Sequence, residues 1–302
     1  AHGGSDNSLL AVSNGSQNLF AKEDAYFAAI ASVDECVRNL VASGADPEKL
    51  SILDNYCWPD PIPSETNPDA EHKMAQLVRS CYALKEIAIQ YKAPLISGKD
   101  SMKNDFIGKH EGKNIKISVS PSLLVTGVAP LKEEHFTTTN FKNHGDTIYL
   151  IGNKLSNELY AGEFTRNFLI DLDESIFPKY DLEENYKLYE DIHKYCGKLK
   201  FSSLHDISEG GLFSALSESC FGGKLGAKLL VSSKNLSLLF NEGLARFIAS
   251  IPQKDEANFE NAFSEHSFTK LGSVSEHYTL EFNDELISLK DLEKAWKESV
   301  NA

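Results

Sequence analysis

Long apolar runs are absent from the sequence, and their absence limits where the protein can act. No stretch approaches the ~18 residues that a membrane-spanning helix needs. The first residues, Ala1-His2-Gly3-Gly4-Ser5, show neither the basic and apolar segments of a secretion signal nor an initiator Met. We therefore expect a cytoplasmic protein with no membrane partner, and a chain that is a fragment or a processed product.

Cysteine is scarce and follows no recognised spacing. The five cysteines stand at positions 36, 57, 81, 196 and 220, without a CxxC pair. This usage indicates free thiols in a reducing compartment. Cys36 and Cys81 fall inside apolar helical patterns, so we expect both to be buried.

Basic residues are outnumbered by acidic ones. Lys and Arg total 30 against 44 Asp and Glu, which gives a formal net charge of −14. A field of this sign repels nucleic acid, so no nucleic-acid partner is expected. A phosphorylated substrate is not excluded, because backbone amides, a lysine or a bound magnesium can reverse the field at one site.

The 302 residues are enough for two domains, and the order of predicted elements indicates an α+β fold. A polar stretch at 131–145 separates two patterned regions, so we place a first domain at 1–138 and a second at 139–302. Helical spacing predicts helices over 24–43, ended by Gly44, and over 69–91. The second helix is expected to turn these residues inward: Met74, Leu77, Val78, Cys81, Leu84 and either Ile87 or Ala88.

Two apolar strand patterns in the first domain are followed by polar residues. Leu50–Leu53 leads to Asp54-Asn55, and Pro94–Ile96 leads to Gly98-Lys99-Asp100-Ser101. Glycine lets a backbone approach a ligand, lysine offers a point charge to phosphate, and Asp offers hard oxygen to magnesium. The second segment is not a Walker A loop, and Asp-Asn alone also favours an ordinary turn. Because both segments are expected at strand ends, Asp54 and Lys99 are predicted to face one cleft.

Glu35 and Asn39 lie four residues apart on the first predicted helix. This spacing puts both side chains on one face, about 6 Å apart along the axis, which suits two ligands of one magnesium. A solvated, hydrogen-bonded pair explains the same spacing.

The segment His205-Asp206-Ile207-Ser208-Glu209-Gly210-Gly211-Leu212 leads through two glycines into a predicted helix. Amides at a helix N-terminus attract anions, Asp206 can bind a metal, and Ser208 can bond a phosphate or a ribose. A capped turn with no ligand fits the pattern equally well. His205 has the chemistry of a general base, but we do not assign it that role.

Taken together, these segments resemble the synthetase region of the formylglycinamide ribonucleotide amidotransferase family. Ile96-Ser97-Gly98-Lys99-Asp100-Ser101-Met102 is similar to its GKDSM motif, and residues 205–212 are similar to its HDxSxGGL turn. The Glu-Asn helix, the Asp-Asn strand and Leu239-Phe240-Asn241-Glu242 with Arg246-Phe247 also match the family pattern. The resemblance covers nearly the whole chain.

The resemblance implies a fold and a reaction. The fold is an A domain that forms half of a shared β-barrel with flanking helices, followed by an α/β sandwich B domain, as in aminoimidazole ribonucleotide synthetase. The reaction is ATP-dependent conversion of formylglycinamide ribonucleotide and ammonia to formylglycinamidine ribonucleotide in purine biosynthesis. This chain resembles the second A–B pair, so its partners would be the first synthetase half and a glutaminase domain or subunit.

The resemblance also implies residue roles. The residues expected to border the ATP and substrate site are Asp54, Asn55, Gly98, Lys99, Asp100 and Ser101. Glu35, Asn39 and Asp206 are implied magnesium ligands at an auxiliary ATP or ADP site, with Ser208 near the nucleotide. The family's catalytic His and glutaminase nucleophile motifs are missing here, so no catalytic residue is assigned and the chain alone is expected to be inactive.

Two alternatives remain from the sequence. One is a self-sufficient homodimeric relative, of the aminoimidazole ribonucleotide or selenophosphate synthetase type. The other is a non-catalytic nucleotide-binding scaffold that completes a partner's barrel. If the chain is instead one half of a shared barrel, its A domain leaves a strand edge and an apolar face exposed, and we expect two isolated chains to associate as a homodimer.

Overall fold

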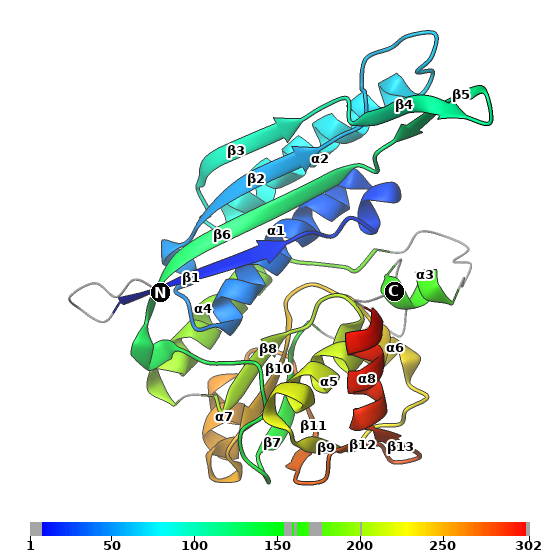
Figure 1. The fold of residues 1–302 in the computed structure, drawn as a ribbon. Coiled ribbons are helices and arrows are strands. Elements are labelled where there is room, and N and C mark those ends of the chain that lie inside the picture. The colour runs from blue at the N-terminus through cyan, green and yellow to red at the C-terminus, as the bar shows by residue number, and fades with distance from the viewer. Residues whose placement is uncertain (1–7, 154–158, 160–161, 169–176, 200, 300–302) are drawn as a thin grey trace. The chain divides into compact units, whose positions relative to one another are not determined.

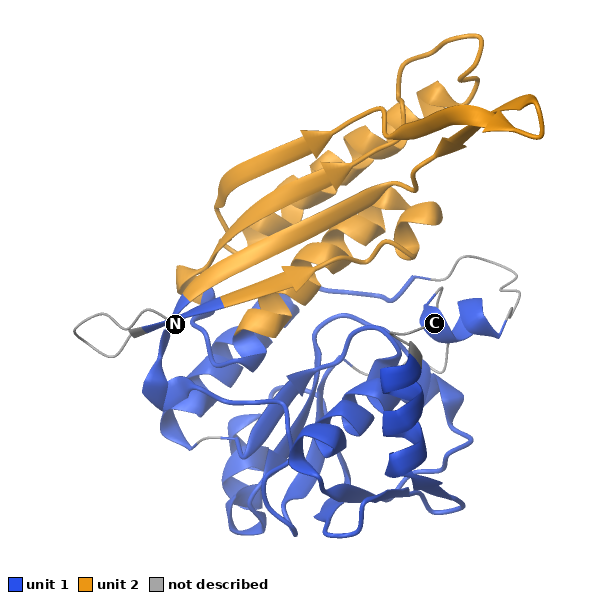
Figure 2. Cartoon of the chain, in the orientation of Figure 1, with its two compact units in different colours: residues 1–11, 41–47, 130–302 blue, residues 12–40, 48–129 orange. Residues whose placement is uncertain are grey.

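The computed structural model describes residues 8–153, 159, 162–168, 177–199 and 201–299. The chain divides into two compact units (Figure 2). Unit 1 comprises Ala1–Ala11, Val41–Pro47 and Pro130–Ala302, and unit 2 comprises Val12–Leu40 and Glu48–Ala129. Within the described residues, no helix is long and apolar enough to cross a membrane.

The main part of unit 2 is a four-stranded sheet with strand order β1-β6-β2-β3 (Figure 1). Strand β2 pairs parallel with β3 and antiparallel with β6. A two-stranded hairpin, β4-β5, follows β3 in the chain. The bounds of the elements are β1 (Ser8–Gly15), α1 (Ala25–Ala42), β2 (Ser51–Cys57), α2 (Ala70–Gln90), β3 (Leu95–Ser101), β4 (Asp105–His110), β5 (Lys113–Ser118) and β6 (Ser122–Lys132), with short 3-10 turns η1 (Phe20–Lys22) and η2 (Pro47–Lys49).

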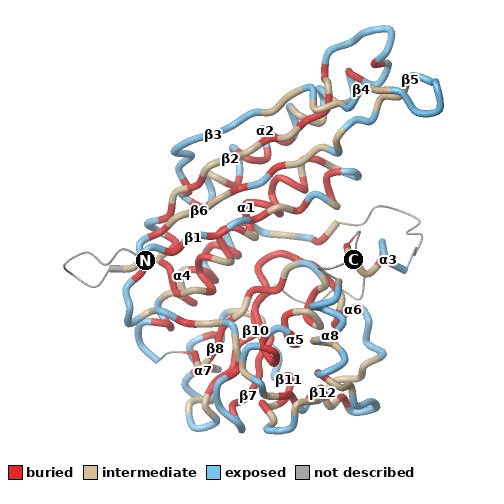
Figure 3. Tube along the Cα trace, viewed as in Figure 1, coloured by how far each residue is buried: buried red, intermediate tan, exposed pale blue. Residues whose placement is uncertain are grey.

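Helices α1 and α2 cover one face of this sheet, and the other face is bare (Figures 1 and 3). Alternate residues along a strand point to opposite faces. Ala11 and Val125 are accordingly buried under the helices, whereas Val12 is 62% exposed and Leu124 36% exposed on the other side. The bare face therefore carries apolar side chains that nothing in unit 2 covers.

Unit 1 contains a seven-stranded sheet with strand order β13-β12-β9-β11-β7-β10-β8. Every residue of the central strands β7 and β10 is buried. The bounds of the elements are η3 (Glu133–His135), β7 (Thr147–Gly152), α3 (Glu163–Asn167), α4 (Leu182–Lys198), β8 (Ser203–Asp206), α5 (Gly211–Gly223), β9 (Gly226–Leu229), α6 (Leu236–Phe240), β10 (Arg246–Ile251), η4 (Gln253–Asp255), α7 (Glu256–Ala262), β11 (Phe268–Ser275), β12 (Thr279–Glu281), β13 (Leu286–Ser288) and α8 (Leu289–Ser299).

Both faces of the seven-stranded sheet are covered. On one face, Ile148 and Leu150 of β7 belong to a core cluster with residues of α5 and with Leu289 of α8. On the other face, Tyr149 packs 4.5 Å, between ring centroids, from Phe259 of α7. Unit 1 is therefore an α/β sandwich, as the sequence predicted for the second domain.

Most predicted elements are present, and Gly44 ends α1 with φ +95° as expected. The inward face of α2 was predicted correctly at its C-terminal end, where Leu84 and Ile87 are buried. It was wrong nearer the N-terminus, where Met74 is 42% exposed, Val78 is 45% exposed and Cys81 is also exposed. Small side chains at Ser80 and Ala83 are buried there and allow α2 to lie close to the sheet. Apolar residues occur on more than one side of this helix, so periodicity alone did not identify the buried side along its whole length.

Candidate functional site

The Asp-Asn and GKDS segments lie side by side within unit 2, but they do not follow the ends of their strands. Asp54 pairs with Gly98 and Asn55 pairs with Lys99, in the interior of the parallel strands β2 and β3. A Cβ on Gly98 would lie 2.8 Å from Oδ1 of Asp54, so glycine makes room for this carboxylate. The predicted neighbourhood is therefore confirmed, whereas the predicted location past the strand ends is wrong.

Strand alternation divides these residues between the two faces of the sheet. The Tyr56 hydroxyl lies 3.0 Å from the Ser80 hydroxyl of α2, so Tyr56 and its alternate neighbour Asp54 face the helices. Asn55 and its partner Lys99 face the bare side. The prediction that Asp54 and Lys99 face one cleft is thus wrong, because the register sets them on opposite faces.

The helix-facing set includes two carboxylates. Burial raises the pKa of Asp54, and the nearby charge of Asp100 raises it further. Burial also raises the pKa of the Cys81 thiol on α2, and the charges of Asp100 and Asp54 act in the same direction. Both carboxylates therefore lie near Cys81, on the side of the sheet that α2 covers.

The bare-face set carries the positive charge. Lys99 is exposed, and its Nζ donates a hydrogen bond to the Ser101 hydroxyl. Asn55 of β2 is paired with Lys99 of β3 and lies beside it. An ammonium, a hydroxyl and an amide on one face can bind an anionic group such as phosphate.

Glu35 and Asn39 occupy one face of α1 within unit 2. Between Phe27 and Ala42 they are the two residues that are not buried. Glu35 accepts a hydrogen bond of 2.8 Å from the backbone N–H of Ser16, and Asn39 donates one of 3.2 Å to the carbonyl of Asn14. Two partly exposed oxygen-bearing side chains on an otherwise buried helix suit a cation that prefers oxygen ligands.

In unit 1, His205 on β8 lies between two carboxylates. Its Nε2 is 2.9 Å from Oε2 of Glu218, and its Nδ1 is 3.3 Å from Oδ1 of Asp206. Although burial lowers the pKa of His205, hydrogen bonds to Asp206 and Glu218 raise it to about 9. An imidazole that is protonated at neutral pH cannot accept a proton, which agrees with leaving His205 without a base role.

The glycine-rich turn after β8 is held by the chain itself. Gly210 and Gly211 adopt φ values of +75° and +66°, and the Gly211 N–H donates to the Ser208 carbonyl over 3.0 Å. The Gly210 N–H donates over 2.9 Å to Oε1 of Glu242. The sequence predicted amides that attract an external anion, but the carboxylate of Glu242 already binds one of them.

Asp206 and Ser208 keep their predicted places at this turn. Asp206 is 3% exposed at the end of β8, and Ser208 is partly exposed. Glu35 and Asn39 belong to unit 2 and Asp206 to unit 1, so the proposed three-residue magnesium site stays a prediction. Among the residues that the structure describes, no three His, Cys, Asp or Glu side chains form a ready cluster for a metal.

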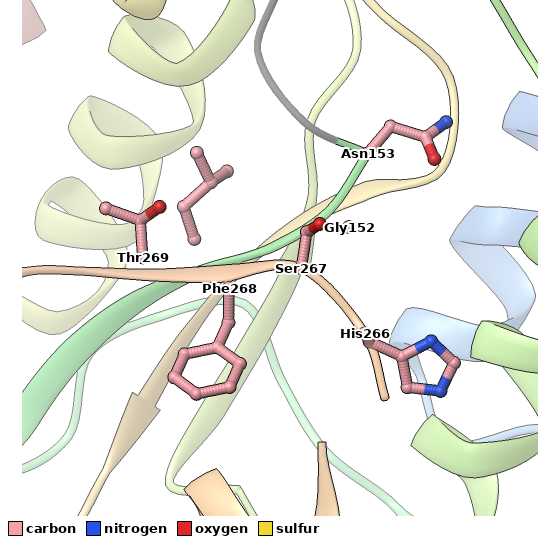
Figure 4. Close-up of a pocket in the computed structure, with 7 residues that line it drawn as sticks. Gly152, Asn153, His266, Ser267, Phe268 and Thr269 are labelled. Carbon is pink, nitrogen blue, oxygen red and sulfur yellow. The ribbon is translucent and has the colours of Figure 1, made fainter. Parts of the chain in front are cut away.

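A pocket of about 480 Å³ lies at the junction of β7 and β11 in unit 1, away from the predicted residues (Figure 4). Two of its polar side chains, Asn153 and His266, are already engaged. The amide of Asn153 donates to Asn185 and to the Leu244 carbonyl, and Nε2 of His266 lies 3.0 Å from Asp191. The geometry of this pocket assigns it no ligand.

Two sequence families match the chain. The N-terminal domain of AIR synthase related protein matches residues 5–129, and its C-terminal domain matches residues 143–283. The predicted domain boundary at 138/139 falls between these ranges, although neither range tests it.

The curated relatives are longer than this chain. Phosphoribosylformylglycinamidine synthase subunit PurL of Thermoplasma volcanium is 26% identical over 97% of this chain and 37% of its own length. The PurL subunit of Thermococcus sibiricus is 30% identical over 90% of this chain and 36% of its own length. The chain therefore spans little more than a third of these relatives.

Solved structures share the fold. Thermotoga maritima PurL complexed with FGAR superposes with a TM-score of 0.74 at 15% identity, covering 95% of this chain and 46% of that chain. Thiamine-monophosphate kinase from Stenotrophomonas maltophilia superposes with a TM-score of 0.63 at 14% identity, covering 93% of this chain and 87% of that chain. With its two domain matches and its similarity to PurL subunits, the chain belongs to the AIR synthase related proteins, as a PurL-like synthetase half.

Proposed function

We propose that the chain is the second synthetase half of phosphoribosylformylglycinamidine synthase. The enzyme would use ATP to join ammonia to formylglycinamide ribonucleotide and form formylglycinamidine ribonucleotide. The observation that carries the proposal is the similarity to PurL over 97% of the chain, with the motifs in matching order. A first synthetase half and a glutaminase domain or subunit would be the partners, in the cytoplasm, where the five free cysteines would remain reduced.

The bare face of the unit 2 sheet supports a shared barrel. Val12, Leu53 and Leu124 belong to this face, and β3 is an edge strand whose residues are almost all exposed. Apolar surface and an unpaired strand edge favour association with another sheet. In the complete enzyme the first half would cover this face, and an isolated chain would form a homodimer instead.

The β2–β3 pair would border the ATP and substrate site. Lys99, with Ser101 and Asn55 beside it, offers positive charge and hydrogen bonds to a phosphate on the bare face. Asp54 of β2 and Asp100 of β3 would act from the opposite face of the sheet, and Gly98 would leave room for the Asp54 carboxylate.

The turn after β8 would belong to an auxiliary ATP or ADP site. Glu35, Asn39 and Asp206 would hold a magnesium ion, and Ser208 would lie near the nucleotide. The partial exposure of Glu35 and Asn39 on a buried helix supports this role. Bound magnesium would supply positive charge that offsets the phosphates.

Phosphate release tests the proposed reaction. The chain is assayed with magnesium–ATP, formylglycinamide ribonucleotide and ammonia, first alone and then with a PurL-like first half. We expect background release alone, because no catalytic His motif of the first half is present, and substrate-dependent release when both halves are combined. Turnover by the chain alone would favour a self-sufficient homodimeric relative, and no turnover in either assay would refute the proposal.

Thermal unfolding tests the auxiliary site separately. A ligand that binds the folded state alone stabilises it by about 2.7 kcal/mol at one hundred times its Kd. Magnesium–ADP should therefore raise the unfolding midpoint of the full chain, and ADP with a chelator should raise it less. Asp206→Asn should reduce the magnesium-dependent part, and an equal rise in that variant would exclude Asp206 as a ligand.

A further inference from the structure

Glu242 joins two segments of unit 1 that are distant in the sequence. Its Oε1 accepts a hydrogen bond of 2.9 Å from the N–H of Gly210 in the glycine-rich turn. The same oxygen accepts a second bond of 2.9 Å from the N–H of Glu163, the first residue of α3. One carboxylate oxygen therefore fixes the distance between α3 and the turn.

The packing around Glu242 leaves little room for another arrangement. A Cβ on Gly162 would lie 2.6 Å from the Glu242 carboxyl carbon, and one on Gly211 would lie 2.7 Å from the Leu239 carbonyl. Phe240 stacks on Phe164 of α3 with ring centroids 4.4 Å apart, and it lies 5.4 Å from the ring of Phe213 on α5. The segment 239–242 thus holds α3 on one side and the start of α5 on the other.

An ionised carboxylate in this position is costly to the fold. Glu242 is 7% exposed. Burial raises its pKa to about 7, the two backbone hydrogen bonds oppose this shift, and the charges of Glu209 in the turn and Glu163 of α3 add to it. Ionisation of Glu242 lowers the stability of the fold. The simplest explanation for a carboxyl group at this position is that it orients the two backbone amides that it binds.

We propose that Glu242 is a positioning residue, which holds the glycine-rich turn in its nucleotide-binding shape by fixing the amides of Gly210 and Glu163. This inference rests on the proposed nucleotide site at Asp206 and Ser208. Ionisation of Glu242 would bury an uncompensated charge and place it beside Glu209 and Glu163. Ionisation therefore loosens the turn, and nucleotide binding weakens as the pH rises through neutrality.

The test is calorimetric titration of the full chain with magnesium–ADP between pH 6 and 8.5. We expect affinity to fall about 10-fold from pH 6 to pH 8 in the wild type, as Glu242 ionises and the turn loosens. Glu242→Gln keeps the shape but cannot ionise, so its affinity should stay near the wild-type value at pH 6 and should lack this fall. Protonation of ADP is common to all the proteins and cancels in the comparison.

Glu163→Gln is the matched control. It removes a neighbouring carboxylate but keeps the backbone N–H that bonds to Glu242. We expect it to retain the wild-type fall in affinity, displaced to lower pH because one like charge is lost. A structural defect near α3 would not produce this displacement.

Amide hydrogen exchange supplies a measurement that needs no variant. Protection of Gly210 and Glu163, corrected for the intrinsic effect of pH, should decrease together in the wild type above about pH 7. Unchanged protection, or a Glu242→Gln titration that follows the wild-type pH profile, would overturn the positioning role. A wild type that binds no magnesium–ADP at any pH while Gly210 and Glu163 stay coupled would refute the proposed nucleotide site instead.

Discussion

The two large sheets of this protein differ in how many of their faces are covered by helices. In unit 1 helices cover both faces, and all residues of β7 and β10 are buried. In unit 2, α1 and α2 cover one face, and β3 is exposed along nearly its whole length. The first sheet is complete in itself, whereas the second leaves apolar residues such as Val12 and Leu124 without cover.

Because of this difference, we expect substitutions in the two sheets to affect stability and function to different extents. The carboxylates of Asp206 and Glu242 beside the glycine-rich turn are buried and hydrogen-bonded within the chain, so changing them should alter the fold and the site together. The polar groups of β3 are exposed, so changing them should alter binding with little effect on folding. Each of the following substitutions tests that division.

The largest effect is expected in the covered core of unit 1. Phe259 is fully buried, and its ring lies against several aromatic neighbours. Phe259→Ala should lower the free energy of unfolding by about 3–5 kcal/mol, because it leaves a cavity that neighbours fill incompletely. Urea denaturation measures the change, and a loss below about 1 kcal/mol would show that this face is loosely packed.

A smaller effect should follow the charge of Glu242. Its pKa is raised from 4.5 to about 7 in the fold, so its stabilising contribution is complete below pH 4.5 and disappears as the pH rises to about 7. The change is worth roughly 3 kcal/mol at most. Denaturation of wild type and Glu242→Gln across this window should give diverging stabilities, and parallel curves would contradict the burial of an ionisable carboxylate.

Lys99 should affect catalysis rather than folding. If Lys99 contacts phosphate in the complete enzyme, as proposed, Lys99→Ala should lower turnover at least ~10-fold, equivalent to about 1.4 kcal/mol, because that charge would be lost. Lys109→Ala on the β4–β5 hairpin is the control for a general loss of surface charge. If Lys99→Ala shows wild-type kinetics, the β2–β3 pair does not belong to the active site.

The smallest stability effect is expected on the bare face. Val12→Lys should change the unfolding free energy of the isolated chain by less than ~0.5 kcal/mol, because Val12 is 62% exposed. The same substitution should prevent association, since a charge would be buried in the contact. Light scattering and denaturation on one preparation compare the two effects, and an unchanged dimer would locate the contact elsewhere.

Sequence reasoning identified the segments that carry the candidate site but not the direction of their side chains. The motifs were read as loops after strands because they are polar. An edge strand such as β3, however, accepts Lys99 and Ser101 within its length, since its side chains reach solvent. The register that separates Asp54 from Lys99 depends on an irregularity between Ile52 and Leu53, for which the local sequence has no clear signature.

Glu242 shows a second limit of the sequence. It lies 32 residues from Gly210, and nothing in the spacing of the two motifs predicts their hydrogen bond. The motif Leu239–Glu242 was recognised only as part of the family pattern. An acidic residue two positions after Phe240, close to an apolar run, was the available signal, because an unpaired carboxylate rarely stays in such a place.

The thiol of Cys81 is exposed and lies near the carboxylates of Asp54 and Asp100, so its rate of chemical labelling depends on the charge beside the β2–β3 pair. Alkylating reagents attack the thiolate, so their rate reports the pKa of the thiol. Partial desolvation of the thiol against the sheet raises that pKa, and the carboxylates of Asp100 and Asp54 raise it further. A cation that neutralises these carboxylates would therefore accelerate modification of Cys81, while the buried Cys36, Cys196 and Cys220 would react slowly. The protein thus carries a native chemical reporter, from which occupancy of this edge can be followed without any engineered probe.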